Sequence, residues 1–154
     1  MRIIRAGPGH IEQARRIWVQ FAEYHQRIDP YYWTVEGADA LFGEYLLGRM
    51  ADPDSMVMVA VDGERLVGYC LAHVHIRAPV FSEAEVGVLS DLAVDEERRG
   101  SGAGGMLVEA AMQWLRERGV RRVELRTSAK NDRAIEFYRK HGFWVYDHMM
   151  TREL

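Results

Sequence analysis

One stretch of this sequence restricts the fold more than any other: RRGSGAGG, Arg98 to Gly105, in which four of the last six residues are glycine. The hydrophobic run LSDLAV precedes it, and apolar residues at helical spacing follow it as far as Leu115. A glycine-rich turn that opens a helix leaves several backbone N–H groups unpaired, and the helix dipole adds partial positive charge there. The stretch therefore predicts a strand, a phosphate-binding turn and a helix, in that order.

Gly100, Gly102 and Gly105 also spell the G-x-G-x-x-G pattern of dinucleotide-binding folds. In those folds the glycines follow their strand directly and belong to a doubled βαβαβ sheet. Here the charged run DEERR intervenes, and only about fifty residues follow. A P-loop is excluded because no Gly-Lys-Ser/Thr ends the turn. The remaining interpretations are a different phosphate-binding turn and a purely structural one.

Hydrophobic periodicity predicts the elements on either side of this turn. Their order, β-α-α-β-β-β-α-β-α-β, indicates an α/β (α+β) fold around a central sheet. The strand, helix and strand around the glycines are expected to form a right-handed parallel crossover. The expected strands cover residues 2–6, 56–61, 66–76, 85–94, 120–127 and 143–150. The expected helices begin at Ile11, Ala38, Gly104 and Asn131, and they end near Asp29, Asp52, Gly119 and Gly142, respectively.

Composition limits the class of protein. The chain has 154 residues, 48% hydrophobic and 28% charged, and is expected to form one domain over residues 1–154. The formal net charge of −3 gives no basic excess, so nucleic acid is not an expected partner. We see no apolar signal segment and no run of ~18 apolar residues, which predicts a soluble cytoplasmic protein with no membrane partner. Cys70 lies in an apolar strand and is expected to be an inert buried thiol.

Two motifs resemble those of the GNAT N-acetyltransferase superfamily. The stretch LAVDEERRGSGAGGMLVEAA is similar to motif A of that family, whose Gln/Arg-x-x-Gly-x-Gly/Ala signature is met by Arg99, Gly102 and Gly104. Downstream, NDRAIEFYRKHGF resembles the motif B region, in which the family's positions are matched by Asn131, Ala134, Tyr138, Gly142 and Phe143. The two motifs stand in the family's order and separation, and the predicted elements match its fold.

The resemblance implies an acyl-CoA N-acyltransferase fold, with a mixed sheet of six or seven strands flanked by about four helices. It also implies acetyl-CoA as co-substrate and no metal. The amides of the glycine turn would hold the CoA pyrophosphate, and the pantetheine arm would run along the preceding strand. Arg98 is preferred over Lys130 and Arg133 for the CoA phosphates, although exposed basic side chains are more often solvated surface. The implied cofactor-binding residues are Leu92, Ala93, Val94, Arg98, Arg99, Gly100, Ser101, Gly102, Ala103, Gly104, Gly105 and Asn131.

Acyl transfer to an amine requires a base and an acid. An alkylamine with a pKa of about 10.4 is protonated at pH 7 and must lose a proton before it attacks, whereas CoA leaves as a thiolate that takes one up. In the family the acid is the tyrosine that matches Tyr138, which is otherwise a core aromatic. Asp91, at a position where some relatives carry a carboxylate, is nominated as the base or as a structural aspartate, with Glu83, Glu85 or a water chain as alternatives. Asn131 is interpreted as a helix N-cap or as a contact of the pantetheine arm.

Two functional hypotheses follow. The first is an N-acetyltransferase that moves acetyl from acetyl-CoA to a primary amine of a small molecule or peptide, by direct attack in a ternary complex. The second is a catalytically inactive acyl-CoA-binding sensor or regulatory domain. The presence of Tyr138 favours the enzyme, because a binding module needs the glycines but not an acid. The acceptor, the use of other acyl groups and the oligomeric state stay open, although homodimers are common in the family.

Two further features each have two interpretations. The aromatic segment DPYYW, residues 29–33, either stacks on a cationic amine or covers the core. His73 and His75 share one face of a strand, but no third ligand stands nearby in the sequence, which favours a polar or partly buried face over a metal pair.

Overall fold

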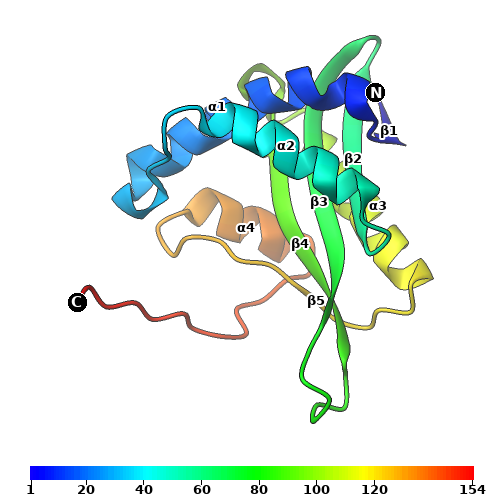
Figure 1. Cartoon of the computed structure of the whole chain (residues 1–154), viewed down its shortest axis with the longest axis vertical. Helices are drawn as coiled ribbons and strands as arrows, with labels where there is room; N and C mark the ends of the chain where they lie inside the picture. The colour runs from blue at the N-terminus through cyan, green and yellow to red at the C-terminus, as the bar shows by residue number, and fades with distance from the viewer.

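The computed structural model describes residues 1–154, which form a five-stranded sheet in the order β1-β2-β3-β4-β5 (Figure 1). Neighbouring strands from β1 to β4 are antiparallel, and β5 is parallel to β4, so the sheet is mixed. The α/β (α+β) class is confirmed, with fewer strands than expected. The strands are β1 Arg2–Arg5, β2 Ser55–Asp62, β3 Arg65–Ile76, β4 Glu85–Val94 and β5 Val123–Glu124, and the helices are α1 Ile11–Ile28, α2 Ala38–Ala51, α3 Ala103–Glu117 and α4 Asp132–Lys140, with short 3-10 turns η1 Pro8–His10, η2 Pro30–Tyr32 and η3 Glu96–Arg98.

Helices cover both faces of the sheet. In Figure 1, α1 and α2 cross the front of the sheet and α3 lies behind it. One core packs α1 and α2 against residues such as Val59 and Leu71, and the other packs α3 against the alternate residues, such as Ala60 and Cys70. The continuous apolar runs of β2 and β3 follow from this burial on both faces.

Most expected element positions are confirmed. β4 has the predicted bounds, and β2 and β3 form the predicted hairpin, whose turn places Gly63 at a φ of +63°. β4 and β5, joined through α3, form the predicted parallel pair. The helices are too short or too polar for any of them to cross a membrane.

Two expected strands differ from the prediction. The strand predicted over 120–127 is reduced to Val123–Glu124, because β5 pairs with β4 only opposite Gly87 and Val88. The strand predicted over 143–150 is absent: residues 144–154 form no backbone–backbone hydrogen bond. Two paired residues give a sixth strand little edge to extend, so the apolar side chains of this segment stay exposed, Met150 by 91%.

Candidate active site

The glycine turn at the end of β4 presents a row of unpaired backbone donors. Gly100 and Gly102 have φ values of +81° and +89°, in the left-handed region that L side chains rarely adopt. Gly102 is the N-cap of α3, and no side chain caps this helix. Within the turn, the amide of Ser101 donates to the carbonyl of Arg98. The amides without an intramolecular hydrogen bond are those of Gly100, Gly102, Ala103, Gly104 and Gly105. Free amides at the N-terminus of a helix, here one of fifteen residues, are the arrangement by which backbones bind anions.

The two arginines before the glycines are held by carboxylates. Arg98 forms an ion pair with Asp62 at the end of β2, and Arg99 Nη1 lies 3.1 Å from Glu96 Oε1. The guanidinium of Arg99 also lies 5.7 Å from the centroid of the Tyr24 ring. The structure therefore places Arg98 on the β2 side of the turn, and places Arg99 against α1. Lys130 is paired with Asp29 at 3.2 Å.

The second half of β4 has one free edge. β5 lies beside β4 only at Gly87 and Val88, so from Leu89 to Val94 no strand pairs with the edge that faces away from β3. Leu92, Ala93 and Val94 lie in this stretch and lead to the glycine turn. An extended molecule that ends in a phosphate can lie along this edge as an added strand, with its phosphate at the turn.

Asp91 follows a bulge in β4. Leu71 of β3 pairs with Asp91 and Ala72 pairs with Leu89, so Ser90 is the extra residue between them. The Asp91 carboxylate forms no hydrogen bond or ion pair, and burial raises its pKa to about 6. Bulges change the direction of nearby side chains and are frequent beside active sites. Asp91 is thus a carboxylate without a partner, with a pKa close to neutrality.

The charge of Asp91 acts on three tyrosines. Burial, followed by the charge of Asp91, raises the pKa of Tyr138, of Tyr69 and of Tyr45. Tyr69 is fully buried and its hydroxyl has no hydrogen-bond partner. Tyr138 of α4 packs against Phe143, with ring centroids 5.7 Å apart. A phenol is protonated at neutral pH, and its raised pKa makes Tyr138 a weaker acid than a free tyrosine. The charge of Asp91 acts on Tyr138, but no hydrogen bond joins the two side chains.

Asn131 joins α4 to α1. Its Oδ1 accepts the amide of Ala134 at 3.1 Å, which confirms the N-cap, and also accepts the Tyr24 hydroxyl at 3.3 Å. His25 Nδ1 lies 2.8 Å from the carbonyl of Phe21 and must donate to it, since a carbonyl only accepts. His25 Nε2 is then free to accept from Asn131 Nδ2, 3.5 Å away. Asn131 is 4% exposed, and its side chain is held by α1.

The contacts of Tyr24 and His25 with Asn131 were not predicted from the sequence. The apolar spacing of α1 placed His25 on a helix face, but no local signal connects it with Asn131, more than a hundred residues later. Tyr24 lies just before His25 and gave no motif of its own. Only the tertiary contact between α1 and α4 identifies these two residues.

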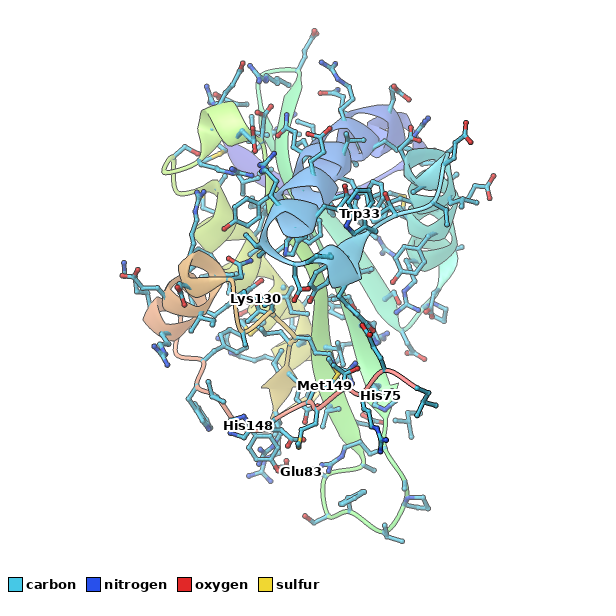
Figure 2. The ribbon with its side chains drawn as sticks, turned by 90° about the vertical axis from the view of Figure 1, so that its left-hand side faces the viewer. Trp33, His75, Glu83, Lys130, His148 and Met149 are labelled. Carbon is cyan, nitrogen blue, oxygen red and sulfur yellow. The ribbon has the colours of Figure 1, made fainter.

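The other candidate side chains lie apart from this cluster. Figure 2 shows Trp33 in the upper part of the molecule, Lys130 near the middle of the view, and Glu83 towards the lower end, below His148 of the C-terminal segment. Glu83 is engaged by Arg122, 2.9 Å away, and neither Glu83 nor Glu85, at the exposed start of β4, lies beside Asp91 along the strand. Trp33 is 74% exposed.

The two histidines that share a face of β3 differ in their surroundings. His73 Nδ1 lies 2.9 Å from the Ser90 hydroxyl, and His75 is exposed. No group of three or more His, Cys, Asp or Glu side chains is arranged to hold a metal ion. Cys70 is buried, and burial raises the pKa of its thiol to about 12, which makes it unreactive at neutral pH.

Comparison with known proteins gives a family match over most of the chain. The profile of the Acetyltransferase (GNAT) family matches residues 18–143. An uncharacterized N-acetyltransferase of Archaeoglobus fulgidus is 30% identical over 138 residues, which cover 90% of this chain and 89% of that protein. An uncharacterized N-acetyltransferase of Methanocaldococcus jannaschii is 29% identical over 119 residues, 77% of this chain, and this chain spans 51% of its length.

Solved structures show the same fold. A crystal structure of a mutant of the BH1408 protein from Bacillus halodurans superposes with a TM-score of 0.90 at 27% identity, and the alignment covers 100% of this chain and 99% of that one. The glycine turn, the free edge of β4 and Tyr138 all fall within the matched residues 18–143.

Proposed function

This chain belongs to the GNAT acetyltransferase family, and on that premise we propose that it transfers acetyl from acetyl-CoA to a primary amine by direct attack in a ternary complex. The observation that supports this most is that β4 carries both a free edge, along which an extended ligand can lie, and a turn with free amides at its end. The free edge of β4 ends at five unpaired amides, and Asp91 lies in this part of β4, with its charge acting on Tyr138 of α4. Acetyl-CoA supplies an activated thioester for this reaction.

The free backbone groups of the glycine turn and of β4 match two parts of CoA, its pyrophosphate and its pantetheine arm. The amides of Gly100, Gly102, Ala103, Gly104 and Gly105 would bind the pyrophosphate, since each lacks an intramolecular acceptor. The backbone of Leu92, Ala93 and Val94 would pair with the amides of the pantetheine arm. Neither contact depends on a side chain, so the glycines matter because they allow close approach and positive φ.

Asp91 is the proposed base. Its pKa of about 6 leaves most of the carboxylate ionised at pH 7, ready to accept a proton from the ammonium of the acceptor. The neutral amine then forms the new C–N bond at the thioester carbonyl carbon. Burial around Asp91 favours binding of a cation there, because the carboxylate has no other partner.

Tyr138 is the proposed acid. When the C–S bond breaks, the sulfur takes the electron pair and the phenol of Tyr138 donates a proton to it, while the proton that the new amide nitrogen loses passes through solvent to reprotonate the phenol. The phenol of Tyr138 is protonated at neutral pH and so carries the proton that this step uses. The exposed aromatic residues near η2, Tyr31 and Trp33, are the proposed acceptor-facing surface, where rings can stack on a cation.

The test is release of free CoA thiol from acetyl-CoA with polyamines, aminoglycosides, amino acids and peptides as acceptors. We expect release that depends on an added amine, with kcat of Tyr138→Phe lower by about 10²–10⁴-fold and acetyl-CoA affinity retained. Absence of amine-dependent release with every class would contradict the enzyme. Tight acetyl-CoA binding without turnover would instead support an acyl-CoA sensor, and a loss of only two-fold in Tyr138→Phe would remove it as the acid.

A further inference from the structure

Tyr24, on the last turns of α1, contacts both regions assigned above to CoA. Its hydroxyl donates to Asn131 Oδ1 at 3.3 Å, at the start of the helix that carries Tyr138. Its ring faces the guanidinium of Arg99, 5.7 Å from the ring centroid, at the start of the glycine turn. Tyr24 therefore bridges the start of the glycine turn and the start of α4, two segments that are separate in sequence.

Other contacts fix the glycine-turn side of this bridge to α1. The amide of Glu96, in η3, donates to Gln20 Oε1 at 3.0 Å. Glu96 Oε1 lies 3.1 Å from Arg99 and 3.9 Å from Arg27 of α1. Arg27 itself lies over the Tyr24 ring, 5.9 Å from its centroid. The ring of Tyr24 thus lies near two guanidinium groups, those of Arg27 and Arg99, that share one carboxylate.

Contacts with α1 also fix the other side of this bridge, at the start of α4. Asn131 is buried, and its Oδ1 accepts two hydrogen bonds, from the Ala134 amide and from Tyr24. His25, next to Tyr24, is within 3.5 Å of Asn131 Nδ2. Lys130, which precedes Asn131, pairs with Asp29 just beyond α1. The end of α1 therefore holds the start of α4 through three contacts to two adjacent residues, Lys130 and Asn131.

We infer that Tyr24 is a positioning residue for the CoA site: its hydroxyl on Asn131 and its ring beside Arg99 set the distance between the glycine turn and the start of α4. The inference rests on the proposed function. A ligand that binds both segments gains affinity when their separation is fixed in advance, because less ordering is required on binding. Tyr24 suits this role because its ring is rigid and its hydroxyl, at the end of the ring, reaches Asn131.

The experiment measures acetyl-CoA dissociation constants by calorimetry, without acceptor, together with thermal midpoints. We expect Tyr24→Phe to bind acetyl-CoA about 2- to 10-fold more weakly, the range for one lost hydrogen bond, and Tyr24→Leu to bind more weakly still, since the contact with Arg99 is also lost. Tyr146→Phe is the matched control: Tyr146 is an exposed tyrosine with a guanidinium, that of Arg122, 5.2 Å from its ring centroid. The control is expected to bind as the wild type does.

A double-mutant cycle separates positioning from general stability. Asn131→Ser keeps an N-cap side chain but is too short to reach Tyr24, so Tyr24→Phe is expected to have little further effect on acetyl-CoA affinity in that background. An unchanged dissociation constant in Tyr24→Phe would overturn the inference, as would an equal loss with and without Asn131→Ser. A lower thermal midpoint with unchanged affinity would assign Tyr24 a structural role only. Failure of the wild type to bind acetyl-CoA would contradict the proposed function instead.

Discussion

The two halves of β4 differ in what lies beside them. In the first half, Gly87 and Val88 lie between β3 and β5, and Gly87 is packed so tightly that a Cβ there would lie 2.7 Å from a side-chain carbon of Leu115. From Leu89 to Val94 one edge is free, a bulge interrupts the ladder, and the half-buried carboxylate of Asp91 has no partner. The first half, the complete half, is paired on both edges at Gly87 and Val88 and is closely packed. The second half, from Leu89 to Val94, is the incomplete half, and it retains unsatisfied groups that a ligand can use.

The largest expected effect falls on the incomplete half. Asp91→Asn removes the proposed base, and we expect kcat/KM with the acceptor to fall by about 10²–10⁴-fold at pH 8. The wild-type rate is expected to fall as pH drops through about 6, because the carboxylate is protonated below its raised pKa and no longer accepts a proton. Steady-state kinetics from pH 5 to 9 measure both. A wild-type profile with no inflection near pH 6 would count against Asp91.

The same substitution is expected to raise stability. The pKa of Asp91 is higher in the folded protein than in the unfolded chain, so its contribution to stability is present at low pH and is lost as pH rises through about 6. Asparagine has no charge to bury, and Asp91→Asn is expected to raise the free energy of unfolding by about 2 kcal/mol at pH 8. Urea unfolding at pH 4 and pH 8 tests this, since the gain should nearly vanish at pH 4.

A substitution in the complete half should have the opposite effect. Gly87→Ala places a methyl group against Leu115 and Val120, both buried, and is expected to lower the free energy of unfolding by about 1–3 kcal/mol. Acetyl-CoA affinity should not change at temperatures where the variant is folded. Denaturation and calorimetry on the same sample separate the two quantities. Weakened acetyl-CoA binding in the folded variant would show that the two halves of β4 are not independent.

Local patterns predicted the glycine turn, the N-cap at Asn131 and the bounds of β4, because each depends on neighbouring residues. The bulge at Ser90, which places Asp91, depends on register with β3 and left no local signal. The contact of Tyr24 with Asn131 spans the molecule and follows from how α1 packs, so no motif contained it. The strand predicted over 143–150 failed for a similar reason, since a strand needs a partner edge and β5 offers only two paired residues.

Amide chemical shifts during a titration with CoA test most directly the claim that the free edge of β4 and its turn are the cofactor site. We predict large shifts for the amides of Gly100, Gly102, Gly104 and Gly105 and for those of Leu92 to Val94, with little change for Val86 to Val88. Saturable binding that shifts the first half of β4 and leaves the glycine amides unchanged would contradict the account.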